Sequence, residues 1–547
     1  MTKQSLKIYL VGINLAYQRQ LQDGRFFTLA HQYLKAYCMT HTLLRERLEI
    51  LTAEFDVFDD DADIVRQIVE TEPDVVGFSS FFWNVKKIIT ITRLVKEVMP
   101  KAVIAVGGPQ GSAEPWTLLD GRTGADFVVK GEGEITFSEL LCNLMFGSPA
   151  LRDIAGLVYK RGDQTVETSC RALMLDLDRI PSPYLSGGIT VDFTRFRGLV
   201  QTFRGCPYAC AYCCWTSREV RLFSWERVKG ELEVLLGKGA RRVYIIDSDL
   251  SLHRKVFRPL LEWLTSLQTD TVFDCSLRIE NLDQDELEMI AKAPIDVCEI
   301  GLQSTNPVAL KNVDRMWQQE RFEKNYFYLR DLPRRRCQII VDLITGLPGD
   351  SYETFRETLR YTAGLWPDKI NFFPLTVLPG SPLRERAGRF GLHTADDDAG
   401  TVVSTQSLPL GEMMRVARLC TAWYLVWALE RLSSRGLSLL LRNLNVDRFT
   451  LIEHADAWFQ QRPDIYRSIQ RDIDTLNPLK NRRAFSAADN QDGRLVSACR
   501  GFVNFVTDKL DQPDTCTAVA TCLALDTLFA VAQVSRPSTF GETACDT

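Results

Sequence analysis

The sequence predicts an α/β protein with two consecutive regions of alternating strands and helices and a mainly helical region behind them. Three observations support this prediction. Short apolar runs alternate with helical patterns over about the first 145 residues, the alternation resumes at residue 198, and it ends near residue 391. The chain has 547 residues, which is too long for one hydrophobic core, so several domains are expected.

The first region contains five strand and helix pairs. Consecutive βα units build a parallel, doubly wound sheet, and such a sheet binds ligands beyond the carboxyl ends of its strands. Residues 1–146 are therefore predicted to form a Rossmann-like binding domain. The strands are expected at residues 7–12, 48–55, 74–79, 102–106 and 126–129.

Residues 147–197 are expected to form a linker that contains a hairpin and, at residues 180–184, a proline-stiffened stretch. Residues 198–391 are predicted to form a second domain of βα units. Its strands are expected at residues 198–203, 242–246, 272–277, 297–301, 338–343 and 369–374.

Residues 392–547 are predicted to be mainly helical, with a loose tail after residue 536. Trp423, Tyr424 and Trp427 are expected in a helix core rather than in a pocket. Mostly amphipathic helices are expected at residues 410–432, 437–444, 464–476 and 495–534.

Three cysteines stand close together after the first strand of the second region. Cys206, Cys210 and Cys213 have the spacing Cys-x3-Cys-x2-Cys, and a short loop can aim three thiolates at one [4Fe-4S] cluster. One iron then lacks a protein ligand and is open to a cofactor or substrate. A zinc site would need a fourth ligand, usually from a second pair, and chance burial is the other alternative. Cys214 is expected to pack or to line the site.

This spacing, with Tyr212 before the last cysteine, resembles the signature of the radical S-adenosylmethionine (SAM) enzymes. In that family the open iron chelates SAM, and an electron from the cluster cleaves SAM to a 5′-deoxyadenosyl radical. The six βα units resemble the family's partial (β/α)6 barrel, a shortened TIM barrel with catalytic groups at the carboxyl ends of its strands. In similar enzymes the C-terminal extension covers the barrel mouth, which is the expected role of residues 392–547.

The resemblance implies SAM-binding roles for residues at later strand ends. Where the family often has Gly-Gly-Glu, this chain has Asp247-Ser248-Asp249, so an aspartate would hold the SAM ammonium group. The planar fork of an arginine suits the SAM carboxylate. Each of these residues could also be an ordinary polar loop residue. The expected SAM-binding residues are Tyr212, Asp247, Asp249, Arg278, Glu280, Gln303, Ser304 and Phe373.

The strand ends of the first region carry glycines and small hydroxyl residues, which let a large cofactor lie against the backbone. Ahead of a radical SAM motif, these loops resemble those of a cobalamin-binding domain; a bare Rossmann-like domain is the alternative. The expected cobalamin-binding residues are Ser79, Ser80, Trp83, Asn84, Gly107, Gly108, Pro109, Gly131, Glu132 and Gly133.

The loop after the first strand differs from that of many cobalamin proteins in the residue that would ligate cobalt from below. Cobalamin mutases and some methyltransferases carry Asp-x-His-x-x-Gly after the first strand, and its histidine ligates cobalt. Here residues 14–19 contain no histidine, while His31 and His41 are expected to be packed or solvated helix residues. The resemblance therefore implies cobalamin without a histidine ligand, which suits methyl transfer. Residues 81–84 are candidates to cover that face, with a place in the core as the alternative.

These features predict a cobalamin-dependent radical SAM enzyme. The leading hypothesis is a C-methyltransferase that moves a methyl group from methylcobalamin to an unactivated carbon of a small-molecule or natural-product precursor. A ring contraction, cyclisation or other rearrangement without methylation is the first alternative, and a noncatalytic iron-sulfur sensor is the second. A methylthiotransferase is disfavoured because the first region offers only Cys38 and Cys142, not a second set of three cysteines.

Charge and composition limit the kinds of binding partner that are expected. A net charge of -5 without a basic tract gives no electrostatic case for nucleic acid. No signal peptide or membrane-spanning run is recognised, and 15 scattered cysteines fit a reducing cytoplasm. The expected cofactors are a [4Fe-4S] cluster, SAM and cobalamin. A small-molecule or peptide substrate and an electron donor such as flavodoxin or ferredoxin are the expected partners.

Overall fold

The computed structural model forms two compact units. One comprises Met1–Asp350 with Phe373–Pro409, and the other comprises Ser351–Phe372 with Leu410–Thr547. The first unit contains both predicted α/β regions almost entirely. The residues that the structure describes are 5–15, 25–215, 217–395, 400–475, 494–509 and 515–523.

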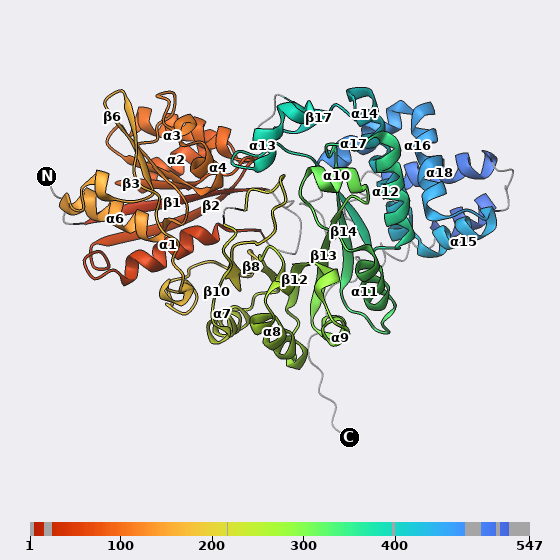
Figure 1. The fold of residues 1–547 in the computed structure, drawn as a ribbon, viewed down its shortest axis with the longest axis horizontal. Helices are drawn as coiled ribbons and strands as arrows, with labels where there is room; N and C mark the ends of the chain where they lie inside the picture. Colours follow the sequence, from red (N-terminus) through yellow and green to blue (C-terminus); the bar gives the residue numbers. More distant parts are fainter. Residues whose placement is uncertain are drawn as a thin grey trace, which may run out of the picture. The chain divides into compact units, whose positions relative to one another are not determined.

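A seven-stranded sheet with the order β2-β1-β3-β4-β5-β6-β7 forms the N-terminal domain (Figure 1). Its first five strands are parallel to one another, which confirms the predicted doubly wound sheet. These strands are β1 (Leu6–Asn14), β2 (Leu48–Asp56), β3 (Val75–Ser79), β4 (Val103–Gly107) and β5 (Phe127–Val129). The helices are α1 (Leu29–Thr40), α2 (Asp61–Thr71), α3 (Val85–Val98), α4 (Gly108–Ala113), α5 (Pro115–Leu118) and α6 (Gly133–Phe146).

Helices cover both faces of this sheet because the side chains of β1 alternate between two apolar cores. Ile8 and Leu10 belong to the core that includes residues of α1 and α6. Tyr9 and Val11 belong to the core that includes residues of α2 and α3. Figure 1 shows these two pairs of helices on opposite sides of the sheet.

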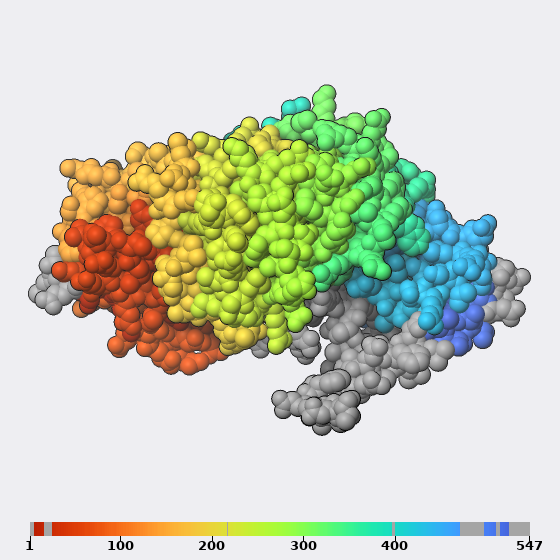
Figure 2. Space-filling view, turned by 90° about the horizontal axis from the view of Figure 1, so that it is seen from below, coloured from red at the N-terminus to blue at the C-terminus, as the bar shows by residue number. Residues whose placement is uncertain are grey.

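The linker adds two strands to the same sheet. β6 (Leu157–Arg161) pairs antiparallel with β5, and β7 (Gln164–Glu167) pairs antiparallel with β6. The hairpin itself agrees with the sequence-based expectation. Its addition to the N-terminal sheet was not predicted. Two 3-10 turns flank the hairpin, η1 (Leu151–Asp153) before it and η2 (Leu177–Arg179) after it. In the space-filling view the orange and yellow atoms of the linker lie directly against the N-terminal domain and the next domain (Figure 2).

A six-stranded sheet with the order β15-β14-β13-β12-β11-β8 contains all six strands predicted for the second α/β region. Its strands are β8 (Gly198–Val200), β11 (Arg242–Ile245), β12 (Val272–Leu277), β13 (Ile295–Gln303), β14 (Gln338–Thr345) and β15 (Lys369–Pro374). Its helices are α7 (Trp225–Gly237), α8 (Arg254–Ser266), α9 (Gln284–Lys292), α10 (Pro307–Asn312), α11 (Gln319–Asp331), α12 (Tyr352–Gly364) and α13 (Pro382–Arg386). Short elements at the strand ends are η3 (Leu250–Leu252), η4 (Ile279–Asn281) and η5 (Gly388–Phe390), and a small pair is formed by β16 (His393–Thr394) and β17 (Val402–Ser404).

The first predicted strand of this region, residues 198–203, is divided in the structure. β8 ends at Val200, and a separate strand, β9 (Phe203–Arg204), pairs antiparallel with β10 (Arg221–Leu222). The residues between β9 and β10 contain the three predicted cluster cysteines and are called the cluster loop below. This small sheet therefore joins the two ends of the cluster loop.

The second unit is helical, as predicted. Trp423 and Trp427 in its longest helix are 0% and 5% exposed, which confirms their expected place in the core. That helix is buried on nearly all sides over its second half and so is central rather than amphipathic. The described helices of this region are α14 (Leu410–Leu432), α15 (Ser434–Leu444), α16 (Arg448–Gln461), α17 (Pro463–Thr475) and α18 (Arg494–Lys509).

Helix α16 was not predicted. Arg448 and Asp456 are both buried in it, and such polar positions interrupt the apolar pattern by which helices are recognised. The helices expected at residues 464–476 and 495–534 lie partly outside the described residues, as does the tail after residue 536. Within the described ranges, no helix has both the length and the apolar character needed to cross a bilayer.

Candidate functional site

The cluster loop, residues 205–220, contains the three predicted iron-sulfur ligands. Cys206, Cys210 and Cys213 are half-buried and lie outside helices and strands. Gly205 opens the loop with φ +103°, and a Cβ at this residue would lie 2.1 Å from the backbone oxygen of Glu219. Only glycine fits this position without moving the backbone, so the two ends of the loop come together closely.

The thiols of the cluster loop lie near one another. Burial, together with the neighbouring thiols of Cys214, Cys210 and Cys206, raises the pKa of the Cys213 thiol to about 11. No three histidine, cysteine or acidic side chains in the described part of the chain are gathered tightly enough to hold a single metal ion. In a [4Fe-4S] cluster each thiolate binds a different iron, so its ligands stand further apart than ligands around one ion. The cysteine-only donor set and the loop geometry fit such a cluster.

Arg315 lies beside the cluster loop, and sequence reasoning missed it. Its Nη1 is 3.9 Å from Cys210 Sγ, and its Nη2 donates a hydrogen bond to the carbonyl of Gly301. The Arg315 Nε is buried without a hydrogen-bond partner. Nothing local in the sequence marks this arginine, because the chain fold alone brings it next to Cys210.

Gln303, a predicted SAM-binding residue, ends strand β13 close to Arg315. Its backbone has φ +72°, which is uncommon for a residue other than glycine. Its Oε1 is buried and has no hydrogen-bond partner. Buried polar atoms are normally paired, so the Gln303 acceptor and the Arg315 Nε donor are available to a bound molecule. This local arrangement fits a polar cofactor such as SAM.

A second part of the site forms around Asp249, which follows strand β11. Its Oδ1 accepts hydrogen bonds from the backbone nitrogens of Ser251 and Arg278, each at 3.1 Å. Its Oδ2 accepts from the Tyr208 hydroxyl at 3.4 Å and from Asn281 Nδ2 at 3.3 Å. Burial raises the pKa of Asp249, and the hydrogen bonds from Ser251 and Arg278 and the Arg278 charge oppose that change.

Arg278 connects two more predicted residues to the cluster loop. Its guanidinium donates to Glu280 Oε1 at 3.0 Å and 3.1 Å and lies 4.1 Å from the centroid of the Tyr208 ring. Tyr208 is in the cluster loop between Cys206 and Cys210. The structure therefore brings Asp249, Arg278 and Glu280 into one buried network with the loop.

Asp247 has a different environment. Its carboxylate accepts hydrogen bonds from the Thr202 nitrogen at 2.9 Å and the Thr202 hydroxyl at 2.5 Å, and burial raises its pKa to about 7. It thus holds the segment that leads into β9. The Ser304 hydroxyl accepts from the Asn306 nitrogen at 3.1 Å, and Phe373 is half-buried in β15. Burial strongly raises the pKa of Tyr212, whose neighbours include Arg315 and Cys210.

Several predicted cobalamin-binding residues hold the strand ends of the N-terminal domain together. The Ser80 hydroxyl donates to the Gly107 carbonyl at 2.6 Å and accepts from the Gly111 nitrogen at 2.9 Å. Asn84 Nδ2 donates to the carbonyls of Ile13 at 2.9 Å and Ser79 at 3.1 Å. These side chains therefore join the ends of β1, β3 and β4.

Gly108 needs its lack of a side chain. Its φ is +92°, and a Cβ would lie 2.5 Å from the Ser80 carbonyl oxygen. Pro109 follows it in the first turn of α4, and Gly133 begins α6. Gly108 and Pro109 thus shape the turn after β4.

The half-buried Trp83 and the open turn at Gly131 lie at the same end of the sheet. The Trp83 ring stacks on Phe81 with centroids 4.4 Å apart, and its Nε1 is buried without a hydrogen-bond partner. Gly131 has φ +73°, and a Cβ there would meet no atom within 4 Å. A flat aromatic surface and an open glycine turn fit a large planar cofactor lying against the strand ends.

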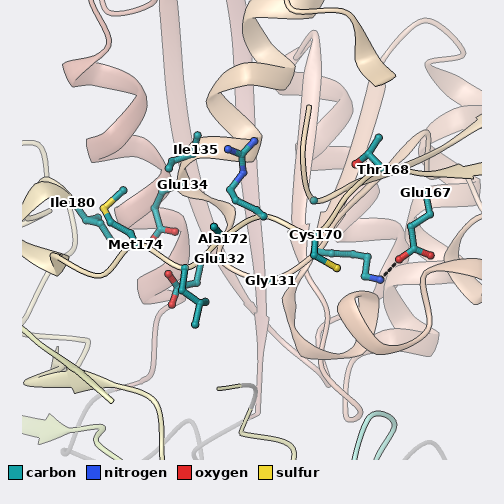
Figure 3. Close-up of a pocket in the computed structure, with 14 residues that line it drawn as sticks. Gly131, Glu132, Glu134, Ile135, Glu167, Thr168, Cys170, Ala172, Met174 and Ile180 are labelled. Atoms are coloured by element: carbon teal, nitrogen blue, oxygen red, sulfur yellow. Dashed lines mark hydrogen bonds and ion pairs between the residues drawn. The ribbon is translucent and has the colours of Figure 1, made fainter. Parts of the chain in front are cut away.

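A cavity of about 210 Å³ lies between the turn after β5 and the linker. Among the lining residues in Figure 3, Gly131, Glu132 and Glu134 lie in the middle of the view, with Met174 on one side and Cys170 on the other. This volume is much smaller than a corrinoid. The carboxylate of Glu132, a predicted cobalamin-binding residue, is engaged by Arg221 at 2.5 Å.

The described residues test only part of the prediction that no histidine ligates cobalt from below. Residues 16–19, which lack a histidine, lie outside them. His31 is buried in α1, and burial lowers its pKa to about 3, so it is neutral at ordinary pH. His31 is thus a packed helix residue, which is one of the two environments expected for it.

Comparison with known proteins agrees with the two α/β domains. A B12 binding domain model matches residues 24–141, and a Radical SAM superfamily model matches residues 200–362. The chain is 25% identical over 453 residues to the cobalamin-dependent radical SAM methyltransferase TokK of Streptomyces tokunonensis, covering 74% of this chain and 62% of that protein. The chain thus spans less than two thirds of this relative.

Two further similarities extend the comparison. The 2-(S-pantetheinyl)-carbapenam-3-carboxylate methyltransferase of Streptantibioticus cattleyicolor is 26% identical over 505 residues, covering 84% of this chain and 70% of that protein. The structure of the cobalamin-dependent S-adenosylmethionine radical enzyme OxsB with aqua-cobalamin superposes with a TM-score of 0.63 at 15% identity. That match covers 98% of this chain and 82% of OxsB, and it supports the fold.

The fold and both family models define a protein that joins a B12-binding domain to a radical SAM domain. Together with the methyltransferase relatives, these domains support a cobalamin-dependent radical SAM enzyme with cobalamin, a [4Fe-4S] cluster and SAM as its cofactors.

Proposed function

We propose that this chain is a C-methyltransferase that moves a methyl group from cobalamin to an unactivated carbon of a small-molecule or natural-product precursor. Two relatives of 25% and 26% identity are methyltransferases by name, which supports this reaction over a rearrangement. When bound, the three cofactors supply the methyl group and the radical chemistry, and the protein supplies binding, orientation and exclusion of water.

Cys206, Cys210 and Cys213 are the proposed cluster ligands. Their loop also carries Tyr208, and the contacts of Tyr208 with Asp249 and Arg278 tie it to the ends of β11 and β12. Thiols must lose their protons to bind iron. Because burial raises the pKa of Cys213, cluster binding would release a proton from this thiol near neutral pH.

The proposed SAM site lies beside that loop. The half-buried Arg315 supplies a positive charge and a buried, unpaired Nε donor, which suit a carboxylate. Gln303 supplies an unpaired acceptor, which suits a hydroxyl or ammonium donor. Asp249 and Glu280 supply two further acceptors in the network around Arg278. The other proposed SAM-binding residues are neighbours of this site, namely Asp247, Ser304, Tyr212 and Phe373.

The proposed cobalamin site lies at the strand ends of the N-terminal domain. Gly131 would let the cofactor approach the backbone, and Trp83 would face its ring system with an unpaired donor. Gly107 and Gly108 would act by shaping the turn after β4. Ser80 and Asn84 would act indirectly, because their polar atoms already join the strand ends.

One observation supports a reaction that uses both the cluster with SAM and cobalamin. Arg204 directly precedes the cluster loop, and its Nη2 is 2.7 Å from Oε1 of Glu134, in the first turn of α6 directly after the β5 turn. The two proposed cofactor loops are therefore neighbours within one compact unit. A methyl transfer that needs a radical at the same substrate carbon requires this proximity.

The test is anaerobic reconstitution with iron, sulfide and hydroxocobalamin. The protein is then reduced in the presence of SAM that carries a deuterated methyl group. The proposal expects labelled methyl on cobalamin, together with S-adenosylhomocysteine and 5′-deoxyadenosine. A chain with Cys206, Cys210 and Cys213 replaced by alanine is the control and should form none of these products. Bound cobalamin that never takes up label, alongside 5′-deoxyadenosine, would instead support a rearrangement.

Candidate precursors would then be screened by product mass. Transfer of the labelled methyl to a carbon of one of them identifies the substrate. A precursor that is consumed without gaining the label would contradict methyl transfer.

A further inference from the structure

Two arginines stand opposite each other at the base of the cluster loop. Arg204 in β9 and Arg221 in β10 are cross-strand partners in the antiparallel pair that joins the two ends of the loop. Both arginine side chains are largely buried, with 13% and 3% exposed. Any group that holds these two side chains also holds the entrance and the exit of the cluster loop.

Two glutamates of the N-terminal domain hold both arginines. Arg221 makes a two-pronged contact with Glu132, with nitrogen to oxygen distances of 3.0 Å and 2.5 Å. Arg204 lies 2.7 Å from Glu134 and 3.5 Å from Glu132. Such bidentate, charge-assisted contacts fix orientation as well as distance. Glu132 thus contacts both arginines, while Glu134 contacts Arg204.

The surroundings restrict these side chains further. The Arg204 guanidinium lies 5.1 Å from the ring centroid of Tyr33 in α1 and 5.9 Å from that of Phe223, which directly follows β10. These two rings are stacked, with centroids 6.4 Å apart and planes 12° from parallel. Arg221 also donates to the Met174 carbonyl of the linker at 2.9 Å. The contact therefore joins the N-terminal domain, the linker and the cluster loop.

The position of the glutamates connects this contact to the cobalamin site. Both lie in the segment Gly131-Glu132-Gly133-Glu134, in which the turn after β5 leads into α6. Gly131 is open there, and the carboxylates face the arginines. Glycine at residues 131 and 133 leaves the turn free of other side chains. One turn can thus contact a cofactor through its backbone and hold the cluster loop through its acidic side chains.

We propose that Glu132 and Glu134 are positioning residues that hold the cluster loop against the turn after β5 and so set the separation between the cluster and cobalamin. The purpose of this arrangement rests on the proposed function, but the contact itself does not. In this proposal Glu132 is a partner of the arginines and not a cobalamin ligand. Removing the carboxylate charges should loosen the cluster loop without weakening cobalamin binding.

The first test uses the full chain without added cofactors, so it does not depend on the proposed function. Hydrogen-deuterium exchange is compared between wild type, E132Q/E134Q and the control E139Q. Glu139 lies on the same helix, α6, and pairs with Arg171 of the linker, so E139Q removes an ion pair that does not touch the cluster loop. Amides of residues 205–220 should exchange at least about tenfold faster in E132Q/E134Q alone, which corresponds to a tenfold change in the opening equilibrium.

Unchanged exchange of residues 205–220 in E132Q/E134Q would overturn the proposal. If exchange rises throughout the N-terminal domain, E134Q alone and R204K are compared. R204K keeps the charge but loses the planar fork, so it should loosen the loop less than E134Q does. Equal loosening across the whole domain in all variants would reduce the contact to a general stabilising interaction and would also overturn the proposal.

The second test measures the separation directly in reconstituted protein. The reduced cluster and cob(II)alamin are both paramagnetic, so pulsed electron paramagnetic resonance reports how far apart they are. E132Q/E134Q should bind cobalamin within about twofold of wild type but show a broader distribution of separations, and E139Q should match wild type. The amount of methylated product per 5′-deoxyadenosine should fall at least tenfold.

The outcomes separate the two proposals. Weaker cobalamin binding with an unchanged separation would make Glu132 a cofactor contact and overturn its positioning role. A wild-type protein that binds both cofactors but never transfers a methyl group would contradict the proposed function, while the exchange experiment would still decide the role of the two glutamates.

Discussion

The guanidinium of Arg278, at the end of β12, lies over the ring of Tyr208 in the cluster loop, 4.1 Å from the ring centroid. The Tyr208 hydroxyl also accepts a hydrogen bond from Asn281 at 2.9 Å. A barrel strand end and the cluster loop are thus connected by one aromatic side chain. The ring contact and the hydroxyl contact can be separated by substitution.

We expect Tyr208→Leu to loosen the cluster more than Tyr208→Phe does. Phenylalanine keeps the ring under Arg278, whereas leucine removes a cation–π contact worth about 1–2 kcal/mol at a buried site. Iron loss to a chelator from the reconstituted protein should then be roughly tenfold faster for Tyr208→Leu than for Tyr208→Phe. Equal rates for the two variants would show that the ring contact does not hold the loop.

Adjacent cysteines provide a matched test of the cluster ligands. Cys213→Ala should lower the iron and sulfide bound after reconstitution to background, because a cluster with two thiolate ligands is poorly held. Cys214→Ala should bind both at the wild-type level, because Cys214 is not a ligand in the proposed set. Chemical analysis and the spectrum of the reduced cluster measure the outcome. Loss of the cluster in Cys214→Ala but not in Cys213→Ala would reassign the third ligand.

Glu54, in β2, should make stability depend on pH. Its carboxylate is buried and accepts hydrogen bonds from Asn14 at 2.7 Å and from the nitrogen and hydroxyl of Thr28, both at 3.0 Å. Burial raises its pKa from 4.5 to about 7, and those hydrogen bonds oppose the change. Between these two values the folded chain keeps a proton that the unfolded chain has released. The free energy of unfolding should therefore fall as the pH rises from about 4.5 to 7 and level off above 7.

Chemical unfolding of the cofactor-free chain between pH 4.5 and 7.5 measures this effect. Glu54→Gln removes the titrating group. The fall in the free energy of unfolding over this pH range should then be smaller by on the order of 2–3 kcal/mol. Glu49→Gln, at an exposed residue of the same strand, is the control. Burial lowers the pKa of His31, whose contribution has the opposite sign and is lost as the pH falls, so the variants are compared with wild type at each pH. Equal slopes for Glu54→Gln and wild type would contradict the prediction.

Local sequence patterns were sufficient for most of the α/β architecture. Strands β12 and β15 begin and end at the predicted residues, because each is a short apolar run between clear helix patterns. The pairing of β6 with β5 could not be predicted in this way, since it depends on contacts between distant segments. Helix α16 was missed for a different reason, because its buried Arg448 and Asp456 break the apolar period.

The candidate site shows the same division. The three cysteines are recognisable because their spacing within one loop already defines the donor set. Arg315 was not, because its approach to Cys210 is created by the fold. Asp247 and Asp249 looked alike in the sequence, yet only Asp249 contacts the cluster loop through its side chain, whereas Asp247 binds Thr202. Tertiary contacts, which no local pattern encodes, distinguish these two carboxylates.

We expect Gln303 to lower the stability of the cofactor-free chain and to strengthen SAM binding. Its φ of +72° is unfavourable for a residue with a side chain and typically costs about 1 kcal/mol or more, and its buried Oε1 has no partner in the chain. A strained residue with an unpaired buried acceptor is expected where a ligand completes the hydrogen bonding. Glycine adopts positive φ freely and carries no amide group. Gln303→Gly should therefore raise the free energy of unfolding of the cofactor-free chain by about 0.5–1 kcal/mol.

The same variant should bind SAM about fivefold to tenfold more weakly after cluster reconstitution, which corresponds to the loss of one hydrogen bond. Glu72→Gly is the matched control, because Glu72 has φ +47° at the exposed C-terminus of α2, away from the barrel strand ends. It should gain stability and keep wild-type affinity for SAM. Calorimetric unfolding and equilibrium titration with SAM measure the two quantities separately. A Gln303→Gly chain that binds SAM as tightly as wild type would show that this side chain does not contact the cofactor, and a less stable chain would show that Gln303 stabilises the fold.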